Sequence, residues 1–381
     1  MTDILPNQRH LFDLEDKGIT YLNCAQVAPF LKSVKQAGYD GIEDHSKPWH
    51  ITSESFFKDA HVVRKCFADL VRASPEQIAL ISSASYGMAI AAKNVAFEKG
   101  QNILSLEEEF PSNYYAWKQL ADRKGGEVRI VKRPVDSNWT PAILNAIDSK
   151  TAVVAVPNCH WTDGSLVDLV ALRKGLGNAG PALVVDATQS LGAYPFDVNT
   201  VKPAFLINAT YKWLLGPYTY GMLYVDEKYL NGEPIEYNWI NRKGSEDFSK
   251  LVEYQDDFQP GARRFDFGEK SNAILVPMVI AALRQLLDWQ ISRINSTIRR
   301  LTDILAQEAP SIGATVVDAP YRAGHMIGLR RQERWPDALR KSLFDQQIYV
   351  SFRGNSIRVS PHVYNSEDDI ARLIDAIKRF A

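Results

Sequence analysis

Short apolar runs alternate with helical patterns along the first two thirds of this 381-residue chain. Continuous apolar runs of a few residues are typical of strands that are buried on both faces of a sheet. Parallel strands need a crossover between them, and a helix usually supplies it. The alternation predicts an α/β fold with a mainly parallel sheet covered by helices. The expected strands lie near 78–81, 102–106, 127–131, 152–156, 182–185, 204–207 and 221–225.

The pattern changes after about Lys250. A turn signal, Gln259-Pro-Gly261, precedes a long helical pattern over 277–298. Short strands and a last helix over 366–380 follow, so we expect a smaller α+β domain with a boundary near 250–260. Upstream of the sheet, apolar residues at helical spacing predict a helix over 53–71.

A glycine motif, Gly175-Leu-Gly-Asn-Ala-Gly180, fits the spacing of a dinucleotide-binding fingerprint. It follows a helical pattern and precedes a strand, whereas the fingerprint needs the opposite order. We interpret it as a helix end and a loop, which argues against a nucleotide-binding oxidoreductase.

Composition excludes several classes of protein. The formal net charge is −1, so nothing favours a polyanionic partner such as a nucleic acid. The three cysteines, Cys24, Cys66 and Cys159, are too few and too scattered for a disulfide framework or a metal cluster. The N-terminus has no signal-peptide pattern, and no apolar run approaches the length of a membrane span. We therefore expect a cytoplasmic protein without a metal, nucleic-acid or membrane partner.

Two polar residues follow neighbouring apolar strands. Asp186 ends the run Ala182–Val185, and Lys212 comes shortly after Ala204–Ile207. In an α/β fold such strand ends can hold one ligand between them. Pyridoxal 5′-phosphate (PLP) needs this pair: its aldehyde condenses with a lysine amine, and a carboxylate must keep its ring nitrogen protonated.

These residues stand in Asp186-Ala-Thr-Gln-Ser190 and Asn208-Ala-Thr-Tyr-Lys-Trp-Leu-Leu-Gly-Pro217, and here the chain resembles the class V aminotransferase family. That family includes cysteine desulfurases, isopenicillin N epimerase-like proteins and kynureninases. The resemblance runs from about Tyr21 to the C-terminus. It implies the PLP-dependent transferase fold (fold type I), with a seven-stranded sheet in a large domain over 18–255. Residues 1–17 and 256–381 would form the small domain, and two subunits would form a homodimer with shared active sites.

The resemblance also implies how the cofactor is held. Lys212 matches the family's Schiff-base lysine, which becomes the catalytic base, and Asp186 matches the partner of the pyridine nitrogen. Ala84 and Ser85 open a helix and match the pair that grips the phosphate. The remaining implied cofactor contacts are the ring-stacking Phe110 and the polar residues Asn113, Gln189, Tyr211 and Asn272.

Substrate-binding residues follow from the same comparison. Arg358 matches the arginine that binds the substrate α-carboxylate through two parallel hydrogen bonds. Arg353 is a second candidate. Trp161 stands where desulfurases carry an asparagine, and we expect it to wall the substrate pocket. Arg264, like Asn272, lies in a region that a dimer partner contributes, and His160 is expected to be structural.

The sequence predicts an enzyme that acts at Cα of an amino acid, by transamination, epimerisation or β-elimination. Persulfide-forming desulfurases carry a nucleophilic cysteine ahead of the substrate arginine, and the segment 347–358 has none. A C–S lyase that needs no enzyme thiol stays open as an alternative. A catalytically silent binding module is the other alternative, although it would not need Lys212, Asp186 and Arg358 together.

Overall fold

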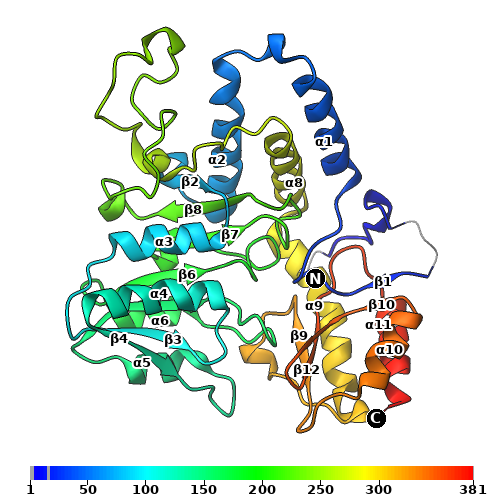
Figure 1. Cartoon of the computed structure of the whole chain (residues 1–381). Helices are drawn as coiled ribbons and strands as arrows, with labels where there is room; N and C mark the ends of the chain where they lie inside the picture. Colours follow the sequence, from blue (N-terminus) through cyan, green and yellow to red (C-terminus); the bar gives the residue numbers. More distant parts are fainter. Residues whose placement is uncertain (1–3, 15–17, 381) are drawn as a thin grey trace.

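A seven-stranded sheet forms the centre of the computed structural model, which describes residues 4–14 and 18–380 (Figure 1). The strand order is β2-β8-β7-β6-β5-β3-β4, and only β8 runs antiparallel to its neighbours. This confirms the predicted α/β fold and its mainly parallel sheet. The strands are β2 (Ile78–Ile81), β3 (Asn102–Leu106), β4 (Glu127–Val131), β5 (Thr151–Pro157), β6 (Ala182–Asp186), β7 (Phe205–Ala209) and β8 (Gly221–Val225).

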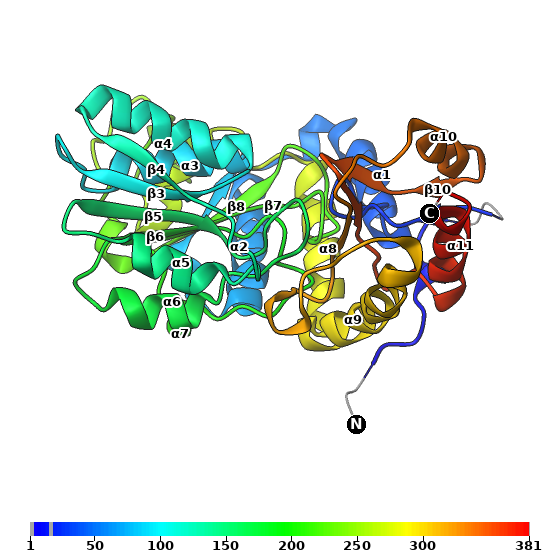
Figure 2. The same ribbon diagram turned by 90° about the horizontal axis from the view of Figure 1, so that it is seen from below.

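Helices cover both faces of this sheet, which explains why most of its strands are apolar and buried over their whole length, whereas the edge strand β4 is not. Figure 2 shows α3 (Ala84–Asn94) and α4 (Pro111–Lys124) on one face. The other face carries α5 (Trp139–Ala146), α6 (Leu169–Leu176) and the short α7 (Val198–Val201). The glycine motif at 175–180 lies at the end of α6 and in the loop before β6, as the sequence predicts.

The C-terminal part has a core of its own. Three antiparallel strands in the order β11-β12-β9 pack with helices, and Ile327, Leu339 and Ile370 belong to the same buried cluster. The strands are β9 (Ile327–Arg330), β11 (Ser351–Arg353) and β12 (Ser356–Val359). The helices are α9 (Ile291–Glu308), α10 (Asp337–Asp345) and α11 (Glu367–Lys378). In Figure 1 these elements lie together beside the large sheet.

Two N-terminal segments attach to this C-terminal part. The backbone N–H groups of Leu5 and Gln8 donate to Thr297 Oγ1 and the Val363 carbonyl. Strand β1 (Thr20–Tyr21) pairs in parallel with β10 (Ile348–Tyr349). The expected arm over 1–17 falls partly outside the described residues, because 1–3 and 15–17 are not among them.

Helix α8 (Leu275–Trp289) packs against α1 (Lys32–His45) and α2 (Lys58–Val71), beside the large sheet. The chain therefore passes between the two parts at more than one place. The domain boundary at 255/256 stays a prediction.

Two predicted helices differ from the structure. The pattern over 277–298 is divided between α8 and α9, because Gln290 adopts a positive φ of 65° and ends α8. The pattern over 53–71 gives a 3₁₀ turn, Glu54–Phe56, followed by α2. Among the described residues, no helix combines the length and the apolar character that crossing a membrane requires.

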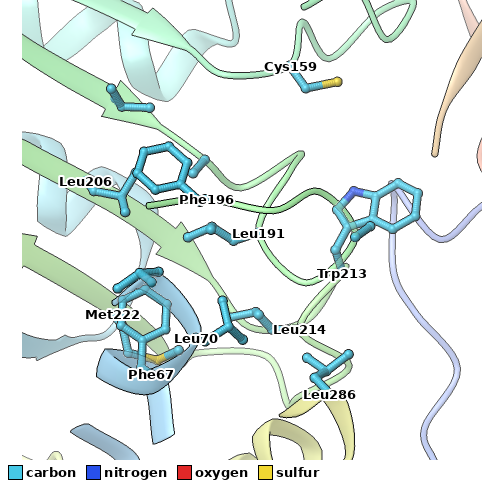
Figure 3. Close-up of a cluster of buried hydrophobic side chains, with 14 of the residues drawn as sticks. Phe67, Leu70, Cys159, Leu191, Phe196, Leu206, Trp213, Leu214, Met222 and Leu286 are labelled. Carbon is cyan, nitrogen blue, oxygen red and sulfur yellow. The ribbon is translucent and has the colours of Figure 1, made fainter. Parts of the chain in front are cut away.

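The loops after β6 and β7 are held together by a buried apolar cluster. Figure 3 draws Leu191 from the first loop, Trp213 and Leu214 from the second, and Leu286 from α8. Gly192 makes the approach of the two loops possible. It has a φ of +100°, and a Cβ there would collide with the Trp213 carbonyl. This packing fixes the two loops, and with them the acidic residue that ends β6 and the lysine that follows β7.

Candidate active site

A cavity of about 390 Å³ lies where β6, β7 and the N-terminus of α3 meet. Asp186 ends β6, and Lys212 follows β7, so the cavity lies at the carboxyl ends of parallel strands, as expected for an α/β ligand site. Of the predicted site residues, the lining includes Ala84, Ser85, Phe110, Trp161, Asp186, Gln189, Tyr211 and Lys212.

Lys212 is the buried cation of this cavity. Its side chain is only 7% exposed, and its Nζ lies 5.4 Å from the centroid of the Tyr211 ring. Among the described residues, no carboxylate lies within ion-pair distance of it. Burial lowers the pKa of Lys212 to about 8, although the Asp186 carboxylate opposes that shift. The amine is therefore partly unprotonated near neutral pH.

Asp186 is held in one orientation by the backbone that follows it. Its Oδ1 accepts a hydrogen bond from the Thr188 N–H at 2.9 Å. Burial raises the pKa of Asp186, and the contacts with Thr188 and the charge of Lys212 oppose this shift. A positively charged ring nitrogen placed beside this carboxylate would stabilise its ionised form.

The N-terminus of α3 provides an anion-binding end to the cavity. Ser83 caps the helix, with its Oγ accepting from the Tyr86 N–H at 3.1 Å. The Ser83 and Ser85 hydroxyls lie 3.0 Å apart, and both residues line the cavity with Ala84. Free backbone N–H groups and hydroxyls at a helix N-terminus suit a phosphate group.

Phe110 and Trp161 form an aromatic wall. Their ring centroids are 5.5 Å apart at an angle of 79°, and the Trp161 indole N–H donates to the Glu108 carbonyl. Glu108 has a positive φ of 58°, which turns the chain just before Phe110. The turn directs Glu109 into the cavity wall.

Glu109 is a site residue that the sequence reading missed. Burial raises the pKa of Glu109 to about 8, and the neighbouring Asp186 carboxylate adds to the shift. The hydrogen bond that the Phe110 N–H donates to the Glu109 carboxylate opposes the shift. In the sequence, Glu107-Glu-Glu109 is typical of a charged surface segment. The one signal that could have marked Glu109 as a site residue is its position directly before Phe110.

Gln189 and Tyr211 complete the cavity wall. The Gln189 amide donates to the Ala25 carbonyl at 3.1 Å and accepts from the Trp213 indole at 2.9 Å. The Tyr211 ring lies 4.5 Å from the ring of Tyr218, which also lines the cavity. Both residues line the cavity, and their contacts with a cofactor stay predictions.

Arg358 lies next to this cavity, in β12. It is 1% exposed, and its Nη1 donates to the Trp161 carbonyl at 2.8 Å. Burial lowers the pKa of Arg358 to about 9, and the charge of Arg353 adds to this shift. Its buried Nε has no hydrogen-bond partner among the described residues.

Besides Arg358, three predicted site residues do not line the cavity. Asn113 is buried in α4, where its Oδ1 accepts from the Trp117 indole at 3.0 Å. Asn272 Oδ1 accepts hydrogen bonds from two N–H groups at the start of α8, and the residue lines a separate cavity beside α1 and α2. Arg264 packs over the Phe258 ring, 5.1 Å from its centroid. Within one chain, Asn272 and Arg264 do not reach the site, so a role for them there needs a second subunit.

His160 belongs to a buried polar network behind Trp161. Arg133 donates to Asp163 at 2.6 Å, and the His160 Nδ1 lies 2.8 Å from the Thr162 hydroxyl. Burial lowers the pKa of His160. The network fixes the loop that carries Trp161, and it agrees with the structural role expected for His160.

The cavity residues fit PLP. A buried lysine with a lowered pKa and a buried carboxylate stand in one cavity, as the aldehyde and the ring nitrogen require. The aromatic side chain of Phe110 can cover a flat ring, and the start of α3 can bind the phosphate.

Comparison with known proteins agrees with this geometry. A model of the family described as aminotransferase class-V matches residues 43–373. The uncharacterized aminotransferase YcbU of Bacillus subtilis (strain 168) is 26% identical over 383 residues, which cover 98% of this chain and 97% of the relative. Isopenicillin N epimerase of Streptomyces clavuligerus is 23% identical over 332 residues, or 82% of each chain.

A solved structure shows the same fold. The complex of the cystine C–S lyase C-DES with its reaction product cysteine persulfide superposes with a TM-score of 0.86 at 17% identity. The superposition covers 96% of this chain and 98% of that one. Because the family model spans most of the sequence, this chain belongs to the class V aminotransferase family of PLP-dependent enzymes.

Proposed function

We propose that this protein binds PLP through Lys212 and reacts at Cα of an amino acid, by transamination, epimerisation or β-elimination. The observation that carries the proposal is the Lys212 amine, which is buried with a pKa lowered to about 8 in the cavity that Asp186 lines. Burial in this cavity would destabilise a lysine that stayed charged, because desolvation disfavours the charged form. A lysine that forms a covalent bond and then transfers protons needs its free amine.

Bound PLP supplies an electron sink that makes the Cα–H bond of an amino acid acidic. In the proposed reaction, Lys212 Nζ is the general base that accepts the Cα proton. Arg358 binds the α-carboxylate and so fixes Cα relative to this amine. Asp186 would keep the ring nitrogen protonated, and the hydroxyls of Ser83 and Ser85 would bind the phosphate. Phe110 would cover the ring and exclude water from it.

A C–S lyase that acts by β-elimination without an enzyme thiol is the second candidate. The hairpin between β11 and β12 carries no cysteine. Cys159 is far from this hairpin in the sequence, yet it lines the cavity. Burial raises the pKa of its thiol well above the ordinary value. A thiol that stays protonated is a poor nucleophile, so this residue gives little support to persulfide formation on the enzyme.

A homodimer with shared active sites is part of the proposal. The support is a set of large apolar side chains exposed on α1 and on the segment 237–254, where a soluble monomer would rarely leave them. Those at least half exposed are Tyr39, Ile42, Tyr237, Val252 and Tyr254. Light scattering during gel filtration tests this point, and a catalytically active monomer would contradict it. We also place the protein in the cytoplasm, because its three cysteines are free.

An absorbance spectrum of the purified protein tests the cofactor and the substrate together. We expect a band at roughly 410–430 nm that disappears on borohydride reduction and shifts with a reactive amino acid. A panel of L- and D-amino acids should be tested, followed by assays for keto acid, released sulfide and inverted stereochemistry. A protein that stays colourless after PLP addition would favour the silent binding module.

A further inference from the structure

A second arginine lies beside Arg358 in the hairpin and contacts Trp161, which lines the cavity. In the hairpin, Ser351 pairs with Arg358 and Arg353 pairs with Ser356. Residues directly opposite each other in a sheet share a face, as do residues two apart on one strand. Arg353 and Arg358 are therefore diagonal neighbours on one face, and both contact Trp161. Arg358 donates to its carbonyl, whereas the Arg353 guanidinium carbon lies 5.5 Å from the centroid of its ring.

Arg353 is held in place but has no ionic partner. It is half-buried, and its Nη1 donates to the Phe352 carbonyl at 2.8 Å. Its Nε is buried and has no hydrogen-bond partner among the described residues. None of the carboxylates in that part of the chain forms an ion pair with Arg353 or Arg358. A half-buried guanidinium without a carboxylate partner has its charge available for an anionic ligand.

The charges around the site indicate what that ligand carries. The charges of Arg353 and Arg358 both lower the pKa of Lys212, and the charge of Arg353 lowers the pKa of Arg358. In the proposed function the α-carboxylate of the substrate pairs with Arg358, and the phosphate lies at the other end of the cavity, beside α3. One cation, Arg353, is then left without a negative partner. It lies on Trp161, whose ring packs against the ring-stacking Phe110.

We propose that Arg353 binds a second anionic group, carried on the substrate's side chain, so that the enzyme prefers amino acids with a carboxylate, sulfinate or sulfonate in that position. Planar guanidinium groups bind such anions through paired hydrogen bonds. The inference rests on the proposed function, because it takes the amino acid to be bound by Arg358 beside Lys212.

Spectral titration of the PLP-loaded protein tests the inference. The probes are L-aspartate, L-glutamate and L-cysteate, with L-asparagine and L-glutamine as neutral analogues of nearly equal size. We expect at least one acidic amino acid to bind more tightly than its neutral analogue. In Arg353→Gln the acidic ligand should bind roughly 10- to 100-fold more weakly, the range for a lost charge-assisted hydrogen bond. The neutral analogues should bind as before.

Arg331→Gln is the matched control. Arg331 also stacks on a tryptophan, 4.9 Å from the centroid of Trp335, but Trp335, unlike Trp161, does not line the cavity. This variant should keep the wild-type preference. Arg353→Lys, which keeps the charge, should retain part of the preference and shows whether Arg353→Gln acts through charge or through misfolding.

Equal binding of acidic and neutral analogues by the wild type would overturn the inference, as would a preference that survives in Arg353→Gln. Either result would leave the proposed function intact, because the PLP band and its shift with neutral amino acids would persist. Failure of the proposed function would look different: no amino acid would shift the band, or no band would form.

Discussion

The Nζ of Lys212 lies 5.5 Å from the centroid of the Phe110 ring. The amine thus faces an aromatic surface, while no acidic side chain in the described part of the chain lies within ion-pair distance of it. This explains why desolvation outweighs the attraction of Asp186 in setting the protonation of Lys212. The same arrangement places a reactive amine beside the surface on which a flat ring can stack.

Attachment of PLP should therefore depend on pH. Below its pKa of about 8 the Lys212 amine is protonated, so the rate of covalent attachment should fall by about tenfold per pH unit. Above that pKa the rate should level off. For an ordinary lysine, the rate would level off at a pH more than two units higher. Mass spectrometry after borohydride reduction measures the attachment. Lys212→Ala should show none, and full attachment in that variant would refute the assignment.

Removal of Arg358 should separate substrate binding from cofactor binding. In Arg358→Ala we expect the amino-acid concentration for half the spectral shift to rise roughly 10- to 100-fold, because a charge-assisted pair is lost. PLP should stay bound, since Arg358 donates to the Trp161 carbonyl and does not line the cavity that Asp186 and Lys212 form. Arg358→Lys should give an intermediate result. Loss of cofactor in parallel with substrate would contradict the carboxylate role.

The strands could be predicted because the signal for each is local. An apolar run such as Ile78–Ile81 is buried over its whole length, and the predicted and observed limits of this strand agree. Asp186 and Lys212 follow such strands, so their meeting in one cavity also follows from the topology. The helix break at Gln290 was not predictable in this way, because neither glycine nor proline marks it.

Other features depend on conformation that the sequence does not display. Glu109 turns inward only because Glu108 takes a positive φ, which is uncommon for a glutamate. The shared face of Arg353 and Arg358 depends on the register of a hairpin, and a shift by one residue would place one of them on the opposite face. Asn272 lies away from the cavity of its own chain, and only an assembly could bring it there.

Glu109 should make the stability of the PLP-free protein depend on pH. Its pKa is about 8 in the folded protein and about 4.3 in an unfolded chain. Between these values the folded state holds one more proton, so the free energy of unfolding should fall as pH rises from about 4.5 to about 8. Each pKa unit corresponds to about 1.4 kcal/mol, so the total change is on the order of a few kcal/mol.

Urea unfolding at several pH values measures this effect. Glu109→Gln cannot titrate and should lose that part of the pH dependence, becoming more stable than the wild type at pH 8. Glu253→Gln is the control, because Glu253 is exposed. If wild type and Glu109→Gln have parallel pH profiles, Glu109 does not titrate in this range.

Asp266 should be needed for folding, although it stands in the region expected to serve a dimer partner. It is 1% exposed and forms a buried ion pair with Arg64, and its Oδ2 lies 3.2 Å from Lys270 Nζ. Its Oδ1 also accepts from the Leu80 N–H at 2.9 Å, which ties the carboxylate to β2. Removing the acid would leave two buried cations unpaired, so Asp266→Ala should destabilise the protein by about 3–5 kcal/mol.

The comparison variant is Asp122→Ala, which removes an exposed ion pair with Lys118. Exposed pairs contribute only about 0–1 kcal/mol, so this variant should unfold nearly as the wild type does. Urea unfolding of the dimer and of any monomer fraction then separates two roles for Asp266. A loss of stability in both forms would show that Asp266 stabilises the fold of a single chain. A loss confined to the dimer would show that Asp266 acts at the subunit interface instead.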